Sequence, residues 1–240
     1  MVLLYIPPVQ NLLRREVTAY ASKATGMQIQ VERIDLRFPL NLLVRGVEVI
    51  QQPDTLLSLE SLNVRVQAWP LLKGKVEVDE VTLSQVAVNS ANLIEGMQIK
   101  GVLGRFFLQS HGVDLSNETA VVNRTELSDT HIQLLMTDTT TTPKDTTASA
   151  PVNWKVNLHQ LKLKNVSFGM KLPADSMKMA AYIGEATIDD AKADLKNQFY
   201  GLKQFLLSGA SASYDTGEAQ PSEGFDASHM AVRNIRIGLD

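Results

Sequence analysis

The chain has 240 residues, of which 44% are hydrophobic and 20% charged, and its formal net charge is −3. This composition is typical of a folded globular protein, and the slightly acidic balance argues against a nucleic-acid binder. There is no cysteine, which excludes disulfides, thiolate metal sites and cysteine nucleophiles.

The first six residues, Met1 to Ile6, are apolar and stop at the pair Pro7-Pro8. Six residues cannot cross a bilayer, which needs about 20. The segment is interpreted either as the end of a longer membrane anchor or as a short N-terminal strand. The residues alone favour neither.

Residues 8–26 have the spacing of an amphipathic helix, because apolar residues recur at i, i+3 and i+4 from Val9 to Ala24. Pro8 suits a first helical turn, and Gly26 suits a C-cap. Arg14 and Arg15 fall on the polar face. We expect the apolar face to cover the open end of a β-sheet; a position on a membrane surface is the alternative. The predicted contact residues of this helix are Leu12, Leu13, Val17 and Tyr20.

From residue 27 onward, apolar residues recur in pairs with a spacing of two, which is the strand period. Two polar residues separate successive pairs, so the phase slips by one residue about every five. Bulges or tight bends are needed to return the apolar side chains to the same face of the strand, and such bulges and bends curl a sheet. Short turns between the strands favour an antiparallel meander. The sequence therefore predicts a curled antiparallel sheet with one apolar side.

The segment from Lys75 to Val88, KVEVDEVTLSQVAV, returns as KVNLHQLKLKNVSF from Lys155 to Phe168. The correspondence continues at the same offset, for example from Gly104 to Gly184. Self-similarity at a fixed offset indicates stacked structural repeats. Chance matches among valines and leucines are the alternative, but glycine and lysine keep the same register.

Two polar stretches interrupt the strand pattern. Residues 137–151 are rich in threonine and predict a mobile loop, and residues 216–224 predict a second loop. The pattern then restarts and stops at Asp240, which we interpret as the truncation of a longer chain. The predicted segments are 1–26 (end of an anchor and capping helix), 27–136 (first β-groove segment), 137–151 (loop), 152–215 (second repeat) and 216–240 (loop and start of a further repeat).

No catalytic constellation is found in the sequence. The four histidines, His111, His131, His159 and His229, have no metal-ligand spacing. Adjacent carboxylates such as Asp189-Asp190 point to opposite faces of a strand and cannot share a proton. We expect neither an enzyme nor a metal site, and no cofactor.

A curled sheet with an apolar concave side must close or fill its groove, because soluble proteins rarely expose large apolar patches. An acyl chain is the expected occupant of a long, narrow apolar trough. The residues predicted to line it are the paired apolar ones: Ile29, Val31, Ile34, Leu36, Val47, Val49, Leu59, Leu62, Val64, Val76, Val78, Val81, Leu83, Val86, Val88, Val156, Leu158, Leu161, Leu163, Val166 and Phe168.

The N-terminal part resembles the start of TamB-type translocation and assembly module proteins, which are relatives of the AsmA group. The likeness is carried by Pro8-Val9-Gln10, by Thr25-Gly26, by the pairs Ile29/Val31 and Ile34/Leu36, and by Gly46-Val47-x-Val49. The paired-strand repeats continue it to Asp240, and the composition is similar to that of Bacteroidetes members. No single motif is diagnostic, and the usual family member is much longer.

The resemblance implies a fold that is mainly β, an open taco-shaped groove. It also implies a single-pass anchor in the bacterial inner membrane, a periplasmic body, and phospholipid transport toward the outer membrane. The implied partners are phospholipid and an outer-membrane barrel protein of the TamA/BamA type. The alternatives are a scaffold or adhesin built as a closed solenoid, and a chaperone for barrel assembly that uses the exposed sheet edge.

Overall fold

The computed structural model describes residues 7–67, 70, 77–114, 118–136, 153–173, 176–218, 226 and 228–239. In this part of the chain one helix, α1 (Pro7–Thr25), precedes the strands of a single sheet. The strands are β1 (Gln28–Arg37), β2 (Asn41–Gln51), β3 (Asp54–Val66), β4 (Val78–Asn89), β5 (Met97–Asp114), β6 (Thr119–Met136), β7 (Lys155–Leu172), β8 (Met177–Asp194), β9 (Phe199–Gly201), β10 (Gln204–Asp215) and β11 (His229–Leu239).

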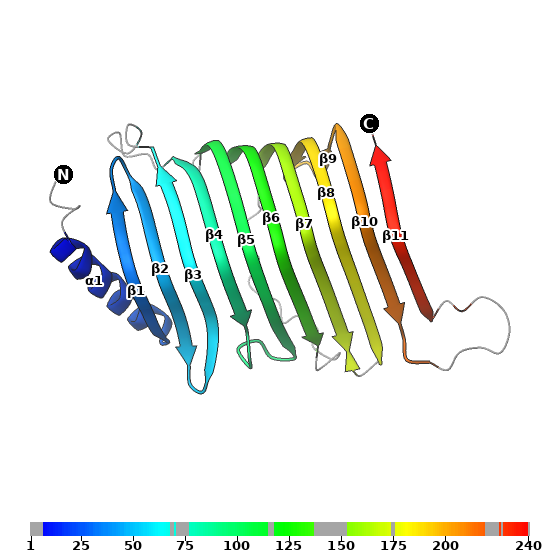
Figure 1. Cartoon of the computed structure of the whole chain (residues 1–240), viewed down its shortest axis with the longest axis horizontal. Coiled ribbons are helices and arrows are strands. Elements are labelled where there is room, and N and C mark those ends of the chain that lie inside the picture. The colour runs from blue at the N-terminus through cyan, green and yellow to red at the C-terminus, as the bar shows by residue number, and fades with distance from the viewer. Residues whose placement is uncertain are drawn as a thin grey trace.

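The sheet is open and has one layer. Its strands follow the order β1-β2-β3-β4-β5-β6-β7-β8-β10-β11, with the short β9 paired to β8 beside β10. Figure 1 shows the strands side by side from α1 at one end to β11 at the other, and β4 to β8 curve over at one end. The predicted mainly-β fold with one N-terminal helix is confirmed, and the closed solenoid of the scaffold alternative is wrong.

All strand pairs are antiparallel except β6 and β7, which run in the same direction. Lys155 therefore enters the sheet opposite Thr119, at the start of β6, and not opposite Met136 at its end. The predicted antiparallel meander is wrong at this one pair. The predicted threonine-rich loop, 137–151, lies outside the described residues.

The predicted offset between the two copies recurs in the structure. β5 begins at Met97 and ends at Asp114, and β8 begins and ends 80 residues later. β6 corresponds in the same way to β9 and β10 together. Left-handed backbone conformations recur at the same offset: Gln85 and Asn165, Gly96 and Ser176, Glu118 and Gln198, Asp129 and Gly209. The two copies therefore repeat each other in backbone as well as in sequence.

The phase slip predicted from the sequence coincides with a bend in the strand. Gln85 lies between two apolar pairs of β4 and has a φ of 50°. Its neighbours Ser84 and Val86 pair with Arg105 and Leu103, so the strand pair keeps a one-to-one count of residues across this point. The slip is therefore a bend without an inserted residue. Asn165 makes the equivalent bend in β7, with a φ of 53°.

The helix covers the sheet edge, as predicted, but it uses polar side chains. The side chain of Gln10 donates to the backbone oxygen of Leu36 at 2.9 Å, and Arg14 donates to that of Glu32 at 2.8 Å. Ser22 accepts from the backbone N–H of Ile29 at 3.1 Å. These contacts occupy backbone groups of β1, which has a strand partner on one side only.

The predicted contact face of the helix is wrong in part. Leu12 and Tyr20 are 56% and 76% exposed, whereas Arg14, predicted on the outer face, is half-buried at the sheet edge. The reason is that an edge strand offers unpaired backbone groups, which only polar side chains can satisfy. The side chains of Leu13 and Val17 are outside the described part of the structure. Gly26, with a φ of 70°, ends the helix as predicted.

The core is thin because the sheet has no second layer. Among the described residues, α1 contacts only β1, and each strand packs mainly against its neighbours in the sheet. No large side chain in this part of the chain is fully buried. The most buried apolar residues are Ile34, Leu56, Ala120, Val122, Ala186 and Ala210, and half of them are alanines.

Candidate functional site

Four rows of residues cross the sheet from β1 to β11, each joining direct partners on neighbouring strands. We call them rows A to D. Row A contains Ile29, Val49, Leu57, Val88, Gly101, Ile132, Phe168, Ala181, Ala212 and Val232. Row B contains Val31, Val47, Leu59, Val86, Leu103, Thr130, Val166 and Ile183, and resumes with Ala210 and Ile235.

The other two rows lie on the far side of the bends. Row C contains Ile34, Val44, Leu62, Leu83, Phe106, Leu127, Leu163, Ala186, Leu207 and Ile237. Row D contains Leu36, Leu42, Val64, Val81, Leu108, Thr125, Leu161, Ile188, Phe205 and Leu239. Rows A and C contain only apolar residues, and rows B and D are interrupted by one threonine each.

Most of the predicted lining residues fall on these rows. Val78 pairs with Val66, while Val156 and Leu158 pair with alanines of β8; these three lie nearer the strand ends. Val76 is outside the described residues. The remaining predicted residues belong to row A (Ile29, Val49, Val88, Phe168), row B (Val31, Val47, Leu59, Val86, Val166), row C (Ile34, Leu62, Leu83, Leu163) or row D (Leu36, Val64, Val81, Leu161).

Sequence reasoning missed the contribution of β5, β6, β8, β10 and β11 to these rows. Phe106 and Leu108 continue rows C and D, and Ala186 and Ile188 do the same in β8. The signal was present, because Leu103, Phe106 and Leu108 have the same spacing of three and then two as Val86, Leu83 and Val81 read backward. Alanines hide the pattern in β8, since a hydropathy pattern gives them little weight.

Polar residues lie between rows B and C. The row of Arg33, Arg45, Ser61, Ser84, Arg105, Ser128, Lys164, Glu185 and Ser208 contains no apolar member. Beside it, the side chain of Asn165 donates to Asp129 Oδ1 at 2.7 Å, across the parallel pair. The two bend residues therefore hold each other through a side-chain hydrogen bond.

Tight packing accompanies the bends. A Cβ on Gly104 would lie 2.7 Å from Cβ of Asp129 and 3.0 Å from its backbone oxygen. A Cβ on Gly184, the equivalent residue, would lie 3.0 Å from the backbone oxygen of Gly209. Glycine is required at Gly104 because the neighbouring strand passes too close for a side chain.

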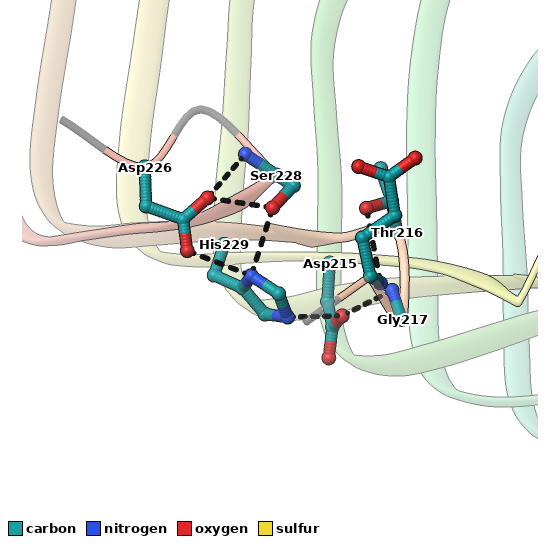
Figure 2. Close-up of polar contacts among 7 residues, drawn as sticks. Asp215, Thr216, Gly217, Asp226, Ser228 and His229 are labelled. Carbon is teal, nitrogen blue, oxygen red and sulfur yellow. Dashed lines mark hydrogen bonds and ion pairs between the residues drawn. The ribbon is translucent and has the colours of Figure 1, made fainter. Parts of the chain in front are cut away.

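A polar cluster fastens the β10–β11 hairpin (Figure 2). His229 Nδ1 lies 2.8 Å from Asp226 Oδ2, and its Nε2 lies 3.3 Å from Asp215 Oδ1. The Ser228 hydroxyl donates to Asp226 at 2.6 Å. This hydrogen bond has the largest effect and lowers the pKa of Asp226. Desolvation, the next largest effect, raises it, and the Ser228 N–H and His229 lower it further.

The cluster resembles a Ser-His-Asp constellation in composition but not in geometry. Ser228 and Asp226 both approach Nδ1 of His229, whereas a nucleophilic serine needs the nitrogen opposite the one that holds the carboxylate. The described residues include no group of three side chains placed to hold a metal ion. The arrangement closes a hairpin and offers no activated nucleophile.

The two ends of the sheet differ. The β1 edge is occupied by side chains of α1, while β11 pairs with β10 alone, and Val232 and Leu239 of β11 are each 56% exposed. Within the described chain, no helix is long and apolar enough to cross a membrane.

Compared with models of known protein families and with curated proteins, the chain shows no significant match to either.

Proposed function

We propose that this chain is a segment of a non-enzymatic periplasmic lipid conduit of the TamB type. It moves phospholipid between the inner and outer membranes along an apolar groove, and so supports outer-membrane biogenesis. A phospholipid occupies the groove in transit, and a barrel protein of the TamA/BamA type is the partner at the outer membrane. The observation that carries this proposal is that rows A to D, apolar apart from Thr125 and Thr130, extend across the sheet from β1 to β11.

The bends support a common apolar face for the four rows. In a straight strand, a separation of three residues, such as that between Leu163 and Val166, puts two side chains on opposite faces. A left-handed residue between them, here Asn165, turns the chain and keeps both on one side. The burial agrees, because Thr130 and Ala210 of row B and Ile34 and Ala186 of row C are all buried.

The open single layer supports a transient occupant. No described element packs on the sheet face, and row residues such as Phe168 and Ile132 are about 40% exposed. Moving an acyl chain of roughly 16 carbons into water costs on the order of 12 kcal/mol, at about 0.8 kcal/mol per CH₂. A continuous apolar surface removes most of that barrier and leaves net binding from a bilayer weak, as transport requires.

Transfer of fluorescent phospholipid between two vesicle populations tests the proposal. Val81→Asp introduces a charge into row D, and Thr82→Asp, the matched control, introduces the same charge one residue away, outside the four rows. We expect Val81→Asp and Leu163→Asp to slow transfer at least about tenfold, and Thr82→Asp to have little effect. Equal rates for Val81→Asp and Thr82→Asp, with folding confirmed by circular dichroism, would contradict the proposal.

The β11 edge favours a second candidate function, a scaffold or chaperone for outer-membrane barrel proteins. An edge strand with one partner can accept a further strand. Because the chain has no cysteine, a single Arg236→Cys variant places one cross-linking group on this edge. Cross-linking to an unfolded barrel protein, without co-purifying phospholipid, favours this candidate. Phospholipid detected by mass spectrometry, without cross-linking, favours the conduit.

A further inference from the structure

His229, the first residue of β11, lies between two carboxylates from different segments of the chain. Its Nδ1 lies 2.8 Å from Asp226 Oδ2, in the connection that precedes β11, and its Nε2 lies 3.3 Å from Asp215 Oδ1 of β10 (Figure 2). Asp215 and His229 are also direct partners in the sheet. Each ring nitrogen therefore faces a carboxylate, and the imidazole joins the two sides of the hairpin.

The hydroxyl of Ser228 decides which ring nitrogen carries the hydrogen when the imidazole is neutral. The Ser228 oxygen lies 2.9 Å from Nδ1 of His229, and its hydroxyl hydrogen is donated to Asp226 Oδ1 at 2.6 Å. Because Nδ1 faces two acceptors it has to be the donor, so a neutral imidazole directs the lone pair of Nε2 toward Asp215. Only the cationic imidazole, with a hydrogen on each nitrogen, donates to both carboxylates at once.

Asp215 has a second cationic neighbour on the other side of its strand. Lys178 of β8 is its direct partner there, but the ion pair that Asp215 makes within the described chain is with His229. Two further charged residues belong to this hairpin, Glu218 after the end of β10 and Arg233 farther along β11, and neither makes an ion pair with a described residue. Since a lysine is cationic at neutral and at mildly acidic pH, the state of His229 decides which neighbour holds Asp215.

These contacts lie at a weakly supported end of the sheet. β11 pairs with β10 alone, and Val232 near its start is 56% exposed. Just beyond the last pair of the ladder, Asp215 and His229, the backbone N–H of Thr216 donates to the oxygen of Ser228 at 3.0 Å. A strand end with few apolar contacts opens at low cost, so the loss of one side-chain contact changes how often this end is open.

We propose that His229 is a pH-operated clasp of the β10–β11 hairpin. In its cationic form it donates to Asp226 and Asp215 and holds the start of β11 on the sheet. In its neutral form it keeps Asp226 and releases Asp215 to Lys178, so the start of β11 opens more often and the edge of β10 is left unpaired. The clasp therefore strengthens as the pH falls through the range in which histidine titrates. This inference is independent of the proposed function.

The second carboxylate remains available over this range. Hydrogen bonding from the Ser228 hydroxyl lowers the pKa of Asp226, so this carboxylate is still ionised where histidine becomes cationic.

Amide hydrogen exchange at Thr216 tests the clasp. The rates are expressed as protection factors, so that the intrinsic pH dependence of exchange cancels. In the wild-type chain we expect protection to fall at least about threefold as the pH rises from about 5 to about 8. Protection that stays constant over this range would overturn the proposal.

Two histidine variants assign the pH dependence to one residue. His229→Gln is the test variant, because a glutamine amide does not titrate. His159→Gln is the matched control, since His159 also lies beside an aspartate, 3.1 Å from Asp190 Oδ1, but outside the hairpin. We expect the pH dependence at Thr216 to vanish in the test variant and to persist in the control. The same pH dependence in both variants would overturn the proposal.

A measurement on the unchanged chain does not depend on the folding of a variant. The nitrogen chemical shifts of the His229 ring at about pH 8 report which nitrogen carries the hydrogen in the neutral form. We expect it on Nδ1. A hydrogen on Nε2 would overturn the proposal, because the neutral imidazole would then donate to Asp215 as well as the cation does.

Discussion

The two copies of the repeat, β4–β6 and β7–β10, have the same backbone bends but different neighbours. In the first copy, β7 runs parallel beside the whole of β6, and Ala120 and Val122 near the start of β6 are buried. In the second copy, β11 pairs only from Phe205 onward. The equivalent residues of the second copy, Tyr200 and Leu202, are 67% and 48% exposed. Burial here is decided by the next strand and not by the residue pattern within a strand.

The largest expected difference between the copies concerns the glycine of the central bend. Gly104→Ala should lower the free energy of unfolding by about 3 kcal/mol, because its Cβ meets that of Asp129. Gly184→Ala should cost about 1 kcal/mol, since Gly209 presents no side chain there. Urea unfolding followed by circular dichroism measures both.

A double variant sharpens this test. Gly104→Ala/Asp129→Gly gives the first copy the residue that the second copy has at this bend, and it should recover most of the lost stability. Asp129→Gly alone measures the loss of the hydrogen bond from Asn165 together with the relief of the left-handed φ at Asp129. No recovery in the double variant would mean that the clash is with backbone and not with the Asp129 side chain.

A second pair of substitutions tests the effect of the neighbouring strand. Val122→Ala should destabilise the protein by about 2 kcal/mol, because the side chain is buried beside Leu158 of β7. Leu202→Ala, at the equivalent position, should change the free energy of unfolding by less than about 1 kcal/mol, since nearly half of its surface is exposed. Equal losses would show that both copies are covered to the same extent.

Much of the fold could be predicted from the spacing of valine and leucine, and the direction of β7 could not. Apolar pairs separated by three residues form a pattern that reads the same forward and backward. Leu127 pairs with Leu163 in the parallel orientation observed, and an antiparallel β7 would match the apolar spacing equally well by pairing Leu127 with Val166. The direction of β7 depends on the segment that connects it to β6, and the apolar residues of that segment follow neither the strand nor the helix spacing.

The apolar rows could be predicted only in part. Val81 and Leu163 are recognised from local spacing, because one strand carries the whole signal. Ala186 and Ala212 belong to the rows only through the strand register, because nothing in their local spacing marks them. The helix contacts were missed for a related reason. The spacing of Leu12 and Tyr20 indicates an apolar face but not the edge that the helix meets.

Gln85 and Asn165, the equivalent bend residues of the two copies, allow a further comparison with a smaller expected effect. Gln85→Gly should stabilise the protein by up to about 1 kcal/mol, because Gln85 has a left-handed φ that glycine adopts at no steric cost. Asn165→Gly gains the same relief but loses the hydrogen bond to Asp129, so its net effect should be smaller or reversed. Differential scanning calorimetry of both variants against wild type resolves the difference.

The smallest expected effect is on the free energy of unfolding at acidic pH. The backbone N–H and the side chain of Asn197 lower the pKa of Asp194 below its ordinary 3.8, with a further contribution from Lys155. A carboxyl with a lowered folded-state pKa contributes stability above about pH 4, and this contribution is lost as the pH falls through the folded-state pKa. Asn197→Ala should raise the pKa of Asp194 in an NMR titration and weaken the acid dependence of unfolding. An unchanged pKa would contradict this assignment.

The hydrogen bonds from Gln10 and Arg14 to β1 also determine how copies of this chain can associate. Head-to-tail growth needs two free ends, and one of them is already taken by the chain's own helix. Two copies that meet through β11 would form a two-fold pair, and the α1 side of the described sheet offers no open strand edge on which a further copy could continue it.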